Sequence, residues 1–501
     1  MLSCLRNSVF GRQMLRISWM VGLLLCAAPA RAAPVLPAVP VGDPMPPITA
    51  SGITVRLTPF VTVPNGAPQL IQAVGDGSGR LAINETGGRI FMTTQAGGAL
   101  GTPYLNLVGT APGFSNGLQG LAFHPDFASN GTFYTGSYAA VGSGIAPLAS
   151  SFGAVNEVVV TEWTATNPAA ATFSGSSREV LRVAQPSDGH AIGMVAFNPN
   201  ATSPSSPDYG RLYVSMGDAG DNQSYALNGQ NTANPYGKVL RIDPTPSGGA
   251  GFTVPSDNPF VGQAGLEQTI WAYGLRNPQY LSWQRGGAQT MYINDIGEGR
   301  IEEVNTGVAG GNYGWSTREG AFATFRDPAI GPDFSPDVFQ LAPGLEPGLL
   351  FPIAQYDHDE GRAIGAGLLY QGGAVPSLTG KFIATDIVNG RLFATDVDGL
   401  LSDSDPAGAV GFQYLDTMLG GINQSLLAYL GAPRADARLG IDDVGNLYVL
   451  SKTNGDIFRV ETMDVAVPAP AALPVLAVAL LGLAMLRGYR PRDQFGVSPV
   501  R

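Results

Sequence analysis

The chain contains very little cysteine. Among its 501 residues there are two, Cys4 and Cys26, and both lie near the N-terminus. Leu25, directly before Cys26, is a poor residue for a lipoprotein cleavage site, so a lipid anchor is the less favoured of two interpretations of this segment. The rest of the chain can form no disulfide, and its stability has to come from a hydrophobic core large enough to stand alone.

Basic residues are also scarce. The chain has 28 lysines and arginines against 39 aspartates and glutamates. Eight of the basic residues but only two of the acidic ones lie in residues 1–32 and 464–501, which leaves 20 basic and 37 acidic residues between these segments. This acidity argues against nucleic acid as a partner, because such binding depends on neutralising phosphates, and against attachment to anionic lipid. Solubility outside the cell is the simpler reason for it.

Long hydrophobic runs are scarce, and the first apolar segment is short. Residues Trp19 to Ala28 follow Arg6, Arg12 and Arg16 and precede the small residues that end at Ala32. This order of charged, apolar and small residues is typical of a secretory signal. The run is shorter than the about 20 residues that span a bilayer. We therefore expect residues 1–32 to be a signal peptide that is cleaved after Ala32, and the protein to be exported.

A second apolar segment lies at the C-terminus. A Val-Pro-Ala-Pro start at residues 467–470 is followed by the apolar stretch Ala471 to Leu486 and then by Arg487, Arg490 and Arg492. This pattern resembles the PEP-CTERM sorting signal of bacteria that export polysaccharide, with Ala469 where that family prefers glutamate. An ordinary terminal membrane helix is the alternative. In either case residues 464–501 are a sorting signal or a membrane anchor, which implies association with a membrane or an exopolysaccharide matrix.

Glycine is abundant, at 67 residues, and the apolar runs of residues 33–463 are short and rich in β-branched or aromatic residues. Glycine, asparagine, aspartate and proline separate these runs, which is the pattern of many short strands. The best candidate for an amphipathic helix is Thr417 to Leu430. The composition therefore predicts an all-β protein.

A repeated unit consists of an apolar strand, a polar turn that often contains glycine, and a second strand that contains an aromatic residue. Such a unit has too little apolar surface to fold alone, and radial stacking of four-stranded blades would bury it. The repeats predict a six-bladed β-propeller over residues 33–463, whereas a pair of β-sandwiches would leave the similar turns unexplained. The six units begin at Ala73, Leu121, Met194, Tyr280, Gly367 and Leu439.

Histidine occurs at three positions only, and each is a candidate because histidine is the usual general base near neutral pH. His124 lies in a turn at a strand end, where a structural role is favoured. His358 has acidic and polar neighbours, which favours an exposed loop. His190 lies in QPSDGHAIG, directly before an apolar strand, and Asp218 follows another strand 28 residues later. We expect Asp218 to orient the imidazole of His190.

Two further segments place polar groups next to strands. Arg276 and Asn277 follow an apolar strand, where a guanidinium can hold a carboxylate or a developing oxyanion. The segment YINDIGEGRIEEVN combines glycines with acidic residues and can present backbone carbonyls to a hard cation such as calcium. The sequence contains no phosphate-binding loop, no HExxH motif and no convincing nucleophilic serine.

A series of motifs follows in one order along nearly the whole of residues 33–463: GLQGLAFHPDF, DGHAIG, MGDAG, YGLRNPQ, DIGEGRIEEVN, GGNYGW, GKFIATDIVNGRLF and RLGIDDVGNLYVL. This series resembles the soluble quinoprotein glucose/sorbosone dehydrogenase family. The resemblance implies a six-bladed propeller that binds pyrroloquinoline quinone (PQQ) and Ca²⁺ and oxidises the anomeric hydroxyl of an aldose, with the cofactor performing the redox step.

The resemblance also implies roles for single residues. His190 falls on the general base, and Asp218 falls on the acid that holds it. Arg276 falls on the residue that polarises a quinone carbonyl, and Asn277 falls on a neighbouring cofactor contact. The backbone carbonyls of Gly297 and Glu298 fall on the positions that bind calcium in the family, and Glu298 replaces a proline.

Some positions depart from the family pattern. Ser115 replaces a longer polar residue that touches the quinone, and Val388 replaces a lysine for a quinone carboxylate. Arg434 and Arg438 are candidates for the family's paired late arginines at a different spacing, with Arg438 the expected cofactor contact. Arg362 is a further candidate partner for an anion.

Three functions are compatible with the sequence. The first is an exported PQQ-dependent dehydrogenase with a small sugar or alcohol substrate and an external electron acceptor. The second is a cell-surface propeller that binds carbohydrate or matrix and has lost the cofactor. The third is a metal-dependent hydrolase, for which Glu298, Glu302 and Glu303 are the local carboxylates, although a solvated charged turn is the simpler interpretation of that cluster.

Overall fold

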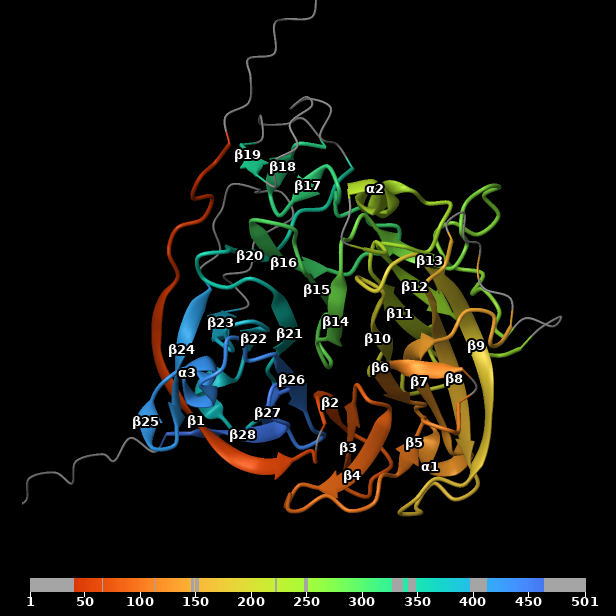
Figure 1. The fold of residues 1–501 in the computed structure, drawn as a ribbon, viewed down its shortest axis with the longest axis horizontal. Coiled ribbons are helices and arrows are strands. Elements are labelled where there is room, and N and C mark those ends of the chain that lie inside the picture. Colours follow the sequence, from red (N-terminus) through yellow and green to blue (C-terminus); the bar gives the residue numbers. More distant parts are fainter. Residues whose placement is uncertain are drawn as a thin grey trace, which may run out of the picture.

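The computed structural model describes residues 40–463, apart from 65, 112, 146–147, 149–152, 221–222, 247–250, 327–336, 341–347 and 397–411. Within these residues the chain is built mainly of β-strands, as the composition predicts (Figure 1). The expected signal peptide at 1–32 and the sorting segment at 464–501 lie outside the described residues. None of the helices in the described part is long and apolar enough to cross a membrane.

The strands of the described residues group into six four-stranded units, which we call blades 1 to 6. Blade 1 contains β2 (Pro68–Ala73), β3 (Arg80–Glu85), β4 (Arg89–Thr94) and β5 (Leu105–Asn106); blade 2 contains β6 (Phe114–Phe123), β7 (Thr132–Ala139), β8 (Asn156–Ala165) and β9 (Gly175–Gln185); blade 3 contains β10 (Ile192–Phe197), β11 (Leu212–Met216), β12 (Lys238–Ile242) and β13 (Ile270–Tyr273).

The later blades follow the same plan. Blade 4 contains β14 (Pro278–Trp283), β15 (Met291–Asp295), β16 (Ile301–Thr306) and β20 (Ala354–Asp357); blade 5 contains β21 (Ile364–Leu369), β22 (Lys381–Asp386), β23 (Leu392–Asp396) and β24 (Gln413–Leu419); blade 6 contains β26 (Ala437–Ile441), β27 (Leu447–Ser451), β28 (Asp456–Thr462) and, from the other end of the chain, β1 (Thr49–Thr62).

The remaining elements of the described part are small. A three-stranded sheet is formed by β17 (Arg318–Glu319), β18 (Phe322–Thr324) and β19 (Val338–Phe339), and β25 (Ile422–Asn423) pairs with β24. The helices are α1 (Phe127–Asn130), α2 (Gln223–Ala226), α3 (Leu426–Leu430) and the 3₁₀ turns η1 (Leu227–Gln230) and η2 (Pro376–Leu378).

The first strand of each blade lies innermost, and these inner strands surround a common centre (Figure 1). Each inner strand contacts that of the next blade, from β2 through β6, β10, β14 and β21 to β26, and β26 contacts β2 again. The core therefore lies between neighbouring blades. One cluster joins apolar side chains of blades 2 and 3, and another joins those of blades 5 and 6.

The six predicted repeats correspond to the six inner strands and the turns that follow them. In blade 6, for example, the Asp442 carboxylate accepts hydrogen bonds from the backbone amides of Val444, at 3.1 Å, and Asn446, at 2.7 Å. Gly445 in the same turn has a φ of 88°, which favours glycine. The turn chemistry that marks the repeat in the sequence thus sets the hairpin between β26 and β27.

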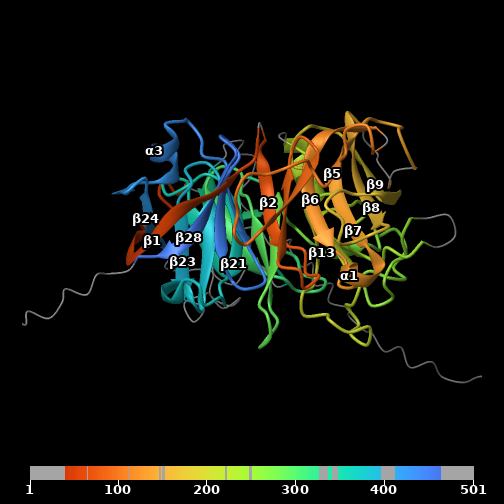
Figure 2. The ribbon, with the colours of Figure 1, turned by 90° about the horizontal axis from the view of Figure 1, so that it is seen from below.

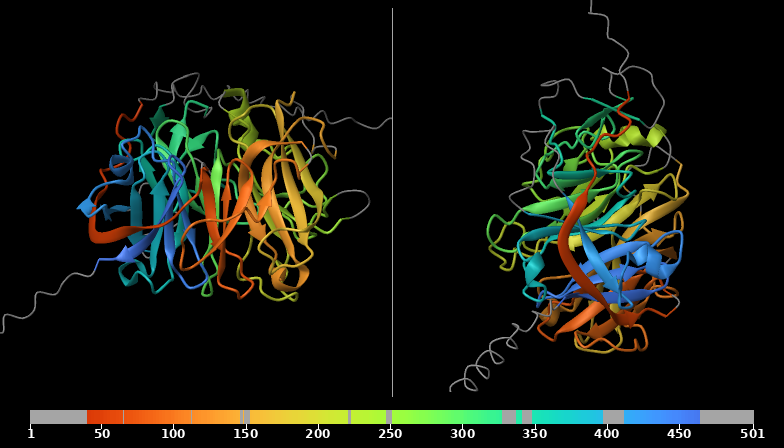
Figure 3. Two further views of the ribbon diagram at one scale, coloured as in Figure 1. Left: turned by 60° about the horizontal axis from the view of Figure 1, so that its bottom comes forward. Right: turned by 90° about the vertical axis from the view of Figure 1, so that its left-hand side faces the viewer.

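The strand β1 joins the first and the last parts of the described chain. It runs antiparallel to β28 on one side and parallel to β24 on the other. Figure 3 shows this long strand, in red, beside the blue C-terminal strands. Figure 2 shows the blades from the side, with α1 and α3 at opposite faces of the molecule. Inner strands begin at the face of α3 and end at that of α1.

The helix expected over Thr417 to Leu430 is wrong in most of its length. Residues up to Leu419 belong to the strand β24, in which alternate side chains are buried. Gly420 and Gly421, with φ values of 60° and 87°, then turn the chain. Only residues 426–430 are helical, and the Ser425 hydroxyl caps them by accepting from the Ala428 amide at 3.2 Å. The glycine pair separates two short elements that one apolar pattern had joined.

Candidate active site

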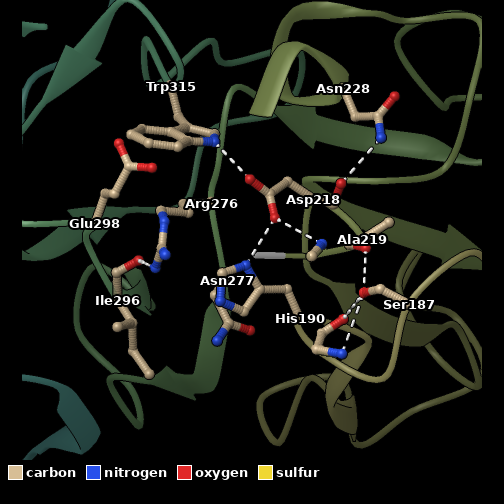
Figure 4. Close-up of polar contacts among 12 residues, drawn as sticks. Ser187, His190, Asp218, Ala219, Asn228, Arg276, Asn277, Ile296, Glu298 and Trp315 are labelled. Atoms are coloured by element: carbon tan, nitrogen blue, oxygen red, sulfur yellow. Dashed lines mark hydrogen bonds and ion pairs between the residues drawn. The ribbon is translucent and has the colours of Figure 1, made fainter. Parts of the chain in front are cut away.

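The register of two strands brings the predicted histidine and aspartate together. Ile192, at the start of β10, pairs with Met216, at the end of β11. His190 and Asp218 each lie two residues beyond this pair, so both leave the sheet at the same face. The His190 Nδ1 and Asp218 Oδ1 atoms are 2.8 Å apart (Figure 4). The separation of 28 residues in the sequence becomes a direct contact.

Both side chains of this pair are withdrawn from solvent. The His190 side chain is 12% exposed and that of Asp218 is 1% exposed. His190 has a φ of 44° and Ala219 a φ of 80°, a conformation that is unusual for residues other than glycine. Their left-handed backbones lie where the chain turns at the site, and the Ala219 amide donates to the His190 carbonyl at 3.2 Å. Backbone strain of this kind is often concentrated at functional sites.

Several donors hold the Asp218 carboxylate in place. Its Oδ2 accepts from the Trp315 indole at 2.9 Å, and its Oδ1 also accepts from the Gly220 amide at 3.3 Å. The Asp218 carbonyl accepts from the Asn228 side chain at 2.9 Å. Figure 4 shows Asp218 between His190 and Trp315. The carboxylate is therefore fixed from both sides, and it fixes the imidazole in turn.

Arg276 and Asn277 are held by a carboxylate that the sequence analysis did not single out. The backbone amides of Arg276 and Asn277 donate to Asp295 at 2.9 and 2.7 Å. Asp295 is 3% exposed, and this burial raises its pKa to about 7, with a smaller contribution from Asp218, against the effect of these hydrogen bonds and of the Arg276 charge. Asp295 thereby positions the start of β14 at the site.

The Arg276 guanidinium lies between an aromatic ring and two carbonyls. It sits over the Trp315 ring at 5.5 Å from the centroid, and its Nη1 donates to the Ile296 carbonyl at 3.2 Å and to the Gly297 carbonyl. The Arg276 carbonyl accepts from the Asp218 amide at 2.7 Å. The structure thus brings His190, Asp218, Arg276 and Asn277 together, as the sequence predicts. What these residues do chemically stays a prediction.

The turn that contains Gly297 and Glu298 is organised by one buried carboxylate. The Oε1 atom of Glu319 accepts from four successive backbone amides, those of Glu298, Gly299, Arg300 and Ile301. The Glu298 carboxylate forms a bidentate ion pair with Arg326, at 2.8 and 3.1 Å. The backbone carbonyls of this turn remain candidate calcium ligands.

Arg438 approaches the centre from blade 6. It is 9% exposed, its Nη1 donates to the Ala437 carbonyl at 2.9 Å, and its Nε has no hydrogen-bond partner. Burial lowers its pKa to about 10. Arg438 lines a small central cavity together with Gln279, whose amide donates to the Asn277 side chain at 3.0 Å. Arg438 and Gln279 therefore line one cavity, and Gln279 is hydrogen-bonded to Asn277 of the site.

Four further predicted residues lie apart from the His190 contacts. Ser115 is exposed in β6, and Val388 is half-buried in a turn whose backbone is held by Asp386. Arg434 is largely exposed and pairs with Asp436 at 3.1 Å. Arg362 lines a separate hollow near the N-terminal segment, described below.

The other two histidines have structural contacts. His124 lies in the turn after β6, at the opposite face, where its Nδ1 accepts from the Asp126 amide at 3.0 Å. His358 was expected in an exposed loop, but this is wrong. Its side chain is 21% exposed, and its Nε2 contacts the fully buried Glu302 at 2.9 Å. The contact with this buried carboxylate keeps the His358 ring near the core. Burial by itself lowers the pKa of His358, but Glu302 outweighs this effect, so that the pKa is raised.

The carboxylates considered for a hydrolase do not converge. Glu302 contacts His358, while Glu303 accepts from the Asn305 side chain at 3.2 Å and the Gly320 amide at 2.5 Å. Glu302 and Glu303 are neighbours in β16, so their side chains point to opposite faces of the strand. Both are buried, which also contradicts the interpretation of this cluster as a solvated turn.

The site includes residues that the sequence analysis missed. Trp315 ends the motif GGNYGW, and Asp295 lies in YIND, so both were quoted without a role. Lys238 was not noticed, although it is fully buried close to Asp218. A hollow of about 540 Å³ lies at the opposite face, where the inner strands end, and is lined by His124 and Asp442 among others.

Fold and site together define a class of protein: a β-propeller with a fixed histidine–aspartate pair and a partly buried arginine at one face. The chain belongs to the glucose/sorbosone dehydrogenase family, whose model matches residues 66–406. This confirms the resemblance seen in the motifs.

Curated relatives include enzymes and proteins with other names. The HIPL1 protein of Arabidopsis thaliana is 26% identical over 369 residues, 64% of this chain and 51% of its own. Quinoprotein glucose dehydrogenase B of Acinetobacter calcoaceticus is 28% identical over 245 residues, 46% of each chain. The Hedgehog-interacting protein of Mus musculus is 29% identical over 227 residues, 43% of this chain and 30% of its own. The chain spans about half the length of the curated relatives it matches first.

Solved structures show the same fold. The apo form of the soluble aldose sugar dehydrogenase of Escherichia coli superposes with a TM-score of 0.57 at 18% identity, covering 82% of this chain and all of the other. The PQQ-bound aldose sugar dehydrogenase of Streptomyces coelicolor gives a TM-score of 0.51 at 20% identity, covering 85% of this chain and all of the other. These likenesses confirm the β-propeller fold.

Proposed function

We propose that the protein is a PQQ-dependent dehydrogenase that oxidises a hydroxyl group of a sugar or a related alcohol. The observation that carries this proposal is the 2.8 Å contact between His190 and the buried Asp218, with the Arg276 guanidinium over the ring of Trp315, whose indole holds Asp218. A base and a cationic group at one place are what such an oxidation requires. The family membership and the relative named quinoprotein glucose dehydrogenase B support the same conclusion.

The residues present suit an anionic, planar quinone. PQQ carries carboxylates, and the buried Arg438 Nε has no partner of its own. A buried guanidinium nitrogen without an acceptor is costly, so a carboxylate there would remove that cost. Arg276, Asn277 and Arg438 are the residues that would hold the cofactor. When bound, PQQ supplies the two-electron acceptor that takes a hydride from the substrate carbon.

The contacts of His190 define its part in the reaction. Because Nδ1 faces the Asp218 carboxylate, the proton of the neutral ring belongs on Nδ1 and the lone pair on Nε2. Nε2 then takes the hydroxyl proton of the substrate. The resulting imidazolium is stabilised by Asp218, which the Trp315 indole holds in place. Arg276 supplies a positive charge where negative charge develops.

We further propose that the backbone carbonyls of Gly297 and Glu298 bind Ca²⁺ together with the cofactor. A carbonyl oxygen has two lone pairs, so the Gly297 carbonyl has room for a cation beside the hydrogen bond from Arg276. The Glu319 carboxylate fixes this turn through four amides, which leaves its carbonyls pre-organised. Calcium prefers oxygen ligands of this kind.

The place of action follows from the expected targeting segments. Export by a signal peptide at residues 1–32 would bring the enzyme to its sugar and to an external electron acceptor, and the segment 464–501 would keep it near the envelope. The acidic composition is compatible with a soluble exported protein.

The experiment is a titration of the purified mature chain with PQQ and CaCl₂, followed by dye reduction with a panel of sugars. We expect His190→Ala to lower turnover by about 10²-fold or more while the affinity for PQQ changes little. His124→Ala, at the opposite face, is the matched control and should retain turnover. Absence of quinone binding at micromolar PQQ would show that the proposal is wrong.

A second candidate is a surface propeller that binds a partner and has lost the cofactor. It is favoured by the exposed Ser115 and the apolar Val388, which replace quinone contacts of the family, and by the similarity to a Hedgehog-interacting protein. The same titration separates the two functions, because this candidate predicts neither quinone binding nor turnover.

A further inference from the structure

A hollow of about 450 Å³ lies between the N-terminal segment and the turn that follows β20. It is separate from the contacts around His190. Three stretches of the chain line it: residues 42–44, residues 299–300, and residues 357–359 together with Arg362. The hollow therefore lies where the segment before β1 crosses the end of blade 4.

Three aspartates meet at this hollow. One carboxylate oxygen from each of Asp43, Asp357 and Asp359 lies within 4.8 Å of the other two. Oxygens at this spacing can all approach one Ca²⁺, whose oxygen ligands lie at about 2.3–2.6 Å. Mg²⁺ needs a tighter octahedron at about 2.0–2.1 Å and keeps more of its water. The spacing thus suits the larger cation better.

Asp357 supplies an observation that is independent of the clustering. It is 3% exposed, and its Oδ1 atom has no hydrogen-bond donor, while Oδ2 accepts from the Met45 amide at 3.1 Å. A buried carboxylate oxygen without a donor is costly unless a proton or a cation compensates it. Burial and the neighbouring Asp359 accordingly raise the pKa of Asp357 to about 7. Asp357 lines the hollow, and its Oδ1 atom has no hydrogen-bond partner there.

The other charged groups nearby have their own partners or leave the balance negative. Arg300 pairs with Asp337 at 2.5 Å, and His358 contacts Glu302. Glu360 accepts from the Ile48 amide at 2.6 Å. Arg362 is the second arginine that lines the hollow. The three aspartates therefore outnumber the two arginines, and one of these, Arg300, is already paired with Asp337.

We propose that Asp43, Asp357 and Asp359 bind a divalent cation, Ca²⁺, with water and backbone oxygens as the remaining ligands. This site is distinct from the calcium site proposed for the cofactor and does not rest on the proposed function. Because two of its three carboxylates are exposed, the affinity should be that of extracellular calcium modules, with a Kd of about 10⁻⁴–10⁻³ M.

The cation would fasten the N-terminal segment to blade 4. Without it this segment is held by the Val41 amide, which donates to the Val338 carbonyl at 2.8 Å, by the Met45 and Ile48 contacts, and by Met45 in an apolar cluster with Ile301 and Val338. A ligand that binds only the folded segment stabilises it by mass action. Calcium should therefore protect residues near 43 from opening.

The test uses the full mature chain, freed of metal with a chelator and kept without PQQ. Calorimetric titration with CaCl₂ should show that Asp357→Asn and Asp359→Asn each bind one equivalent fewer than the unaltered chain, or bind that equivalent at least tenfold more weakly. Calcium should also raise the Tm and slow proteolysis near residue 43 in the unaltered chain only. Asp443→Asn, an exposed aspartate at the other face, is the matched control.

Two results would overturn the proposal. One is unchanged calcium stoichiometry and affinity in Asp359→Asn, which is exposed and should fold normally even if Asp357→Asn does not. The other is a combination of two measurements: the Tm of the unaltered chain does not respond to millimolar CaCl₂, and Asp357→Asn is at least as stable as the unaltered chain. This combination would show that a proton, and not a cation, compensates the cluster. Loss of PQQ binding in the earlier experiment would leave both readouts unaffected.

Discussion

Lys238 is a fully buried lysine that lies close to Asp218. Its Nζ donates to three backbone carbonyls, those of Asn228, Gly229 and Tyr236, at 2.6 to 2.9 Å. Burial lowers its pKa well below the usual value, and Asp218 acts in the opposite direction. Asn228 in turn donates to the Asp218 carbonyl. Lys238 therefore fixes the segment around Asn228, and Asn228 in turn fixes Asp218.

We expect Lys238→Met to reduce the free energy of unfolding by about 3 kcal/mol or more, because three buried carbonyls lose their donor. Urea denaturation measures this loss. Lys381→Met is the control, since Lys381 pairs with the largely exposed Asp396 and its removal should change stability by less than about 0.5 kcal/mol. Equal losses in both variants would contradict the structural role of Lys238.

His124 should make stability depend on pH in a defined direction. Its Nδ1 accepts from the Asp126 amide, so the neutral ring is the form that fits. Burial lowers the pKa of His124 below 6.5, although Asp126 and Glu162 act against this. The unfolded chain therefore takes up the proton first as the pH falls through 6.5, and stability is lost.

We expect the unaltered chain to lose more stability between pH 7.5 and pH 5.5 than His124→Asn, whose amide oxygen also accepts but does not titrate. Urea denaturation at the two pH values measures the difference. A larger loss in the variant, or equal losses, would show that His124 does not supply this pH dependence.

The residues of the candidate site differ in how far the sequence predicted them. His190, Asp218, Arg276 and Asn277 stand in motifs beside strand ends, and the structure brings them together. The residues that fix them were not predicted. Asp295 accepts from the backbone amide of Arg276, and Trp315 donates to Asp218, which lies 97 residues earlier in the sequence. Hydrogen bonds between segments so far apart depend on how the blades pack, which no local pattern encodes.

At the scale of elements, turns were predicted better than boundaries. The polar turns between inner and second strands repeat in the sequence, and each repeat became the start of a blade. The strand β1 was missed, because it precedes the first repeat and the sequence analysis assigned no element to its residues, although they alternate between buried and exposed in its second half. Its partners β24 and β28 come more than 350 residues later, as in the pair Thr49 and Gln413, so its pairing is not visible locally.

Leu57 shows how much β1 contributes. Its side chain is 3% exposed in the cluster that joins blades 5 and 6, and its backbone pairs with Val460 of β28. We expect Leu57→Ala to lower the free energy of unfolding by about 2–5 kcal/mol, as for other buried leucines. Val444→Ala, at a side chain that is 60% exposed, is the control and should have almost no effect. A small effect at Leu57 in urea denaturation would show that β1 is loosely packed.

At the scale of the whole molecule, the first and the last strands of the described chain meet in blade 6. Three strands of this blade come from residues 437–462 and the fourth from residues 49–62. The same strand pairs with β24 of blade 5, so β1 completes one sheet and connects it to the next. Without β1 the edges of β24 and β28 would both be open. Open sheet edges are sites of aggregation.

Two truncations of the mature chain test this arrangement. A chain that begins at Val63 lacks β1, and we expect it to elute from size-exclusion chromatography as aggregates and to unfold without a sharp transition, because two edges and the core face around Val55 and Leu57 become exposed. A chain that ends at Met463 keeps all pairings of blade 6 and should elute as the unaltered protein does. If the chain lacking β1 were monomeric and unfolded as cooperatively as the unaltered protein, the remaining strands would suffice to hold the propeller, and the joining of the two ends would contribute little to its stability.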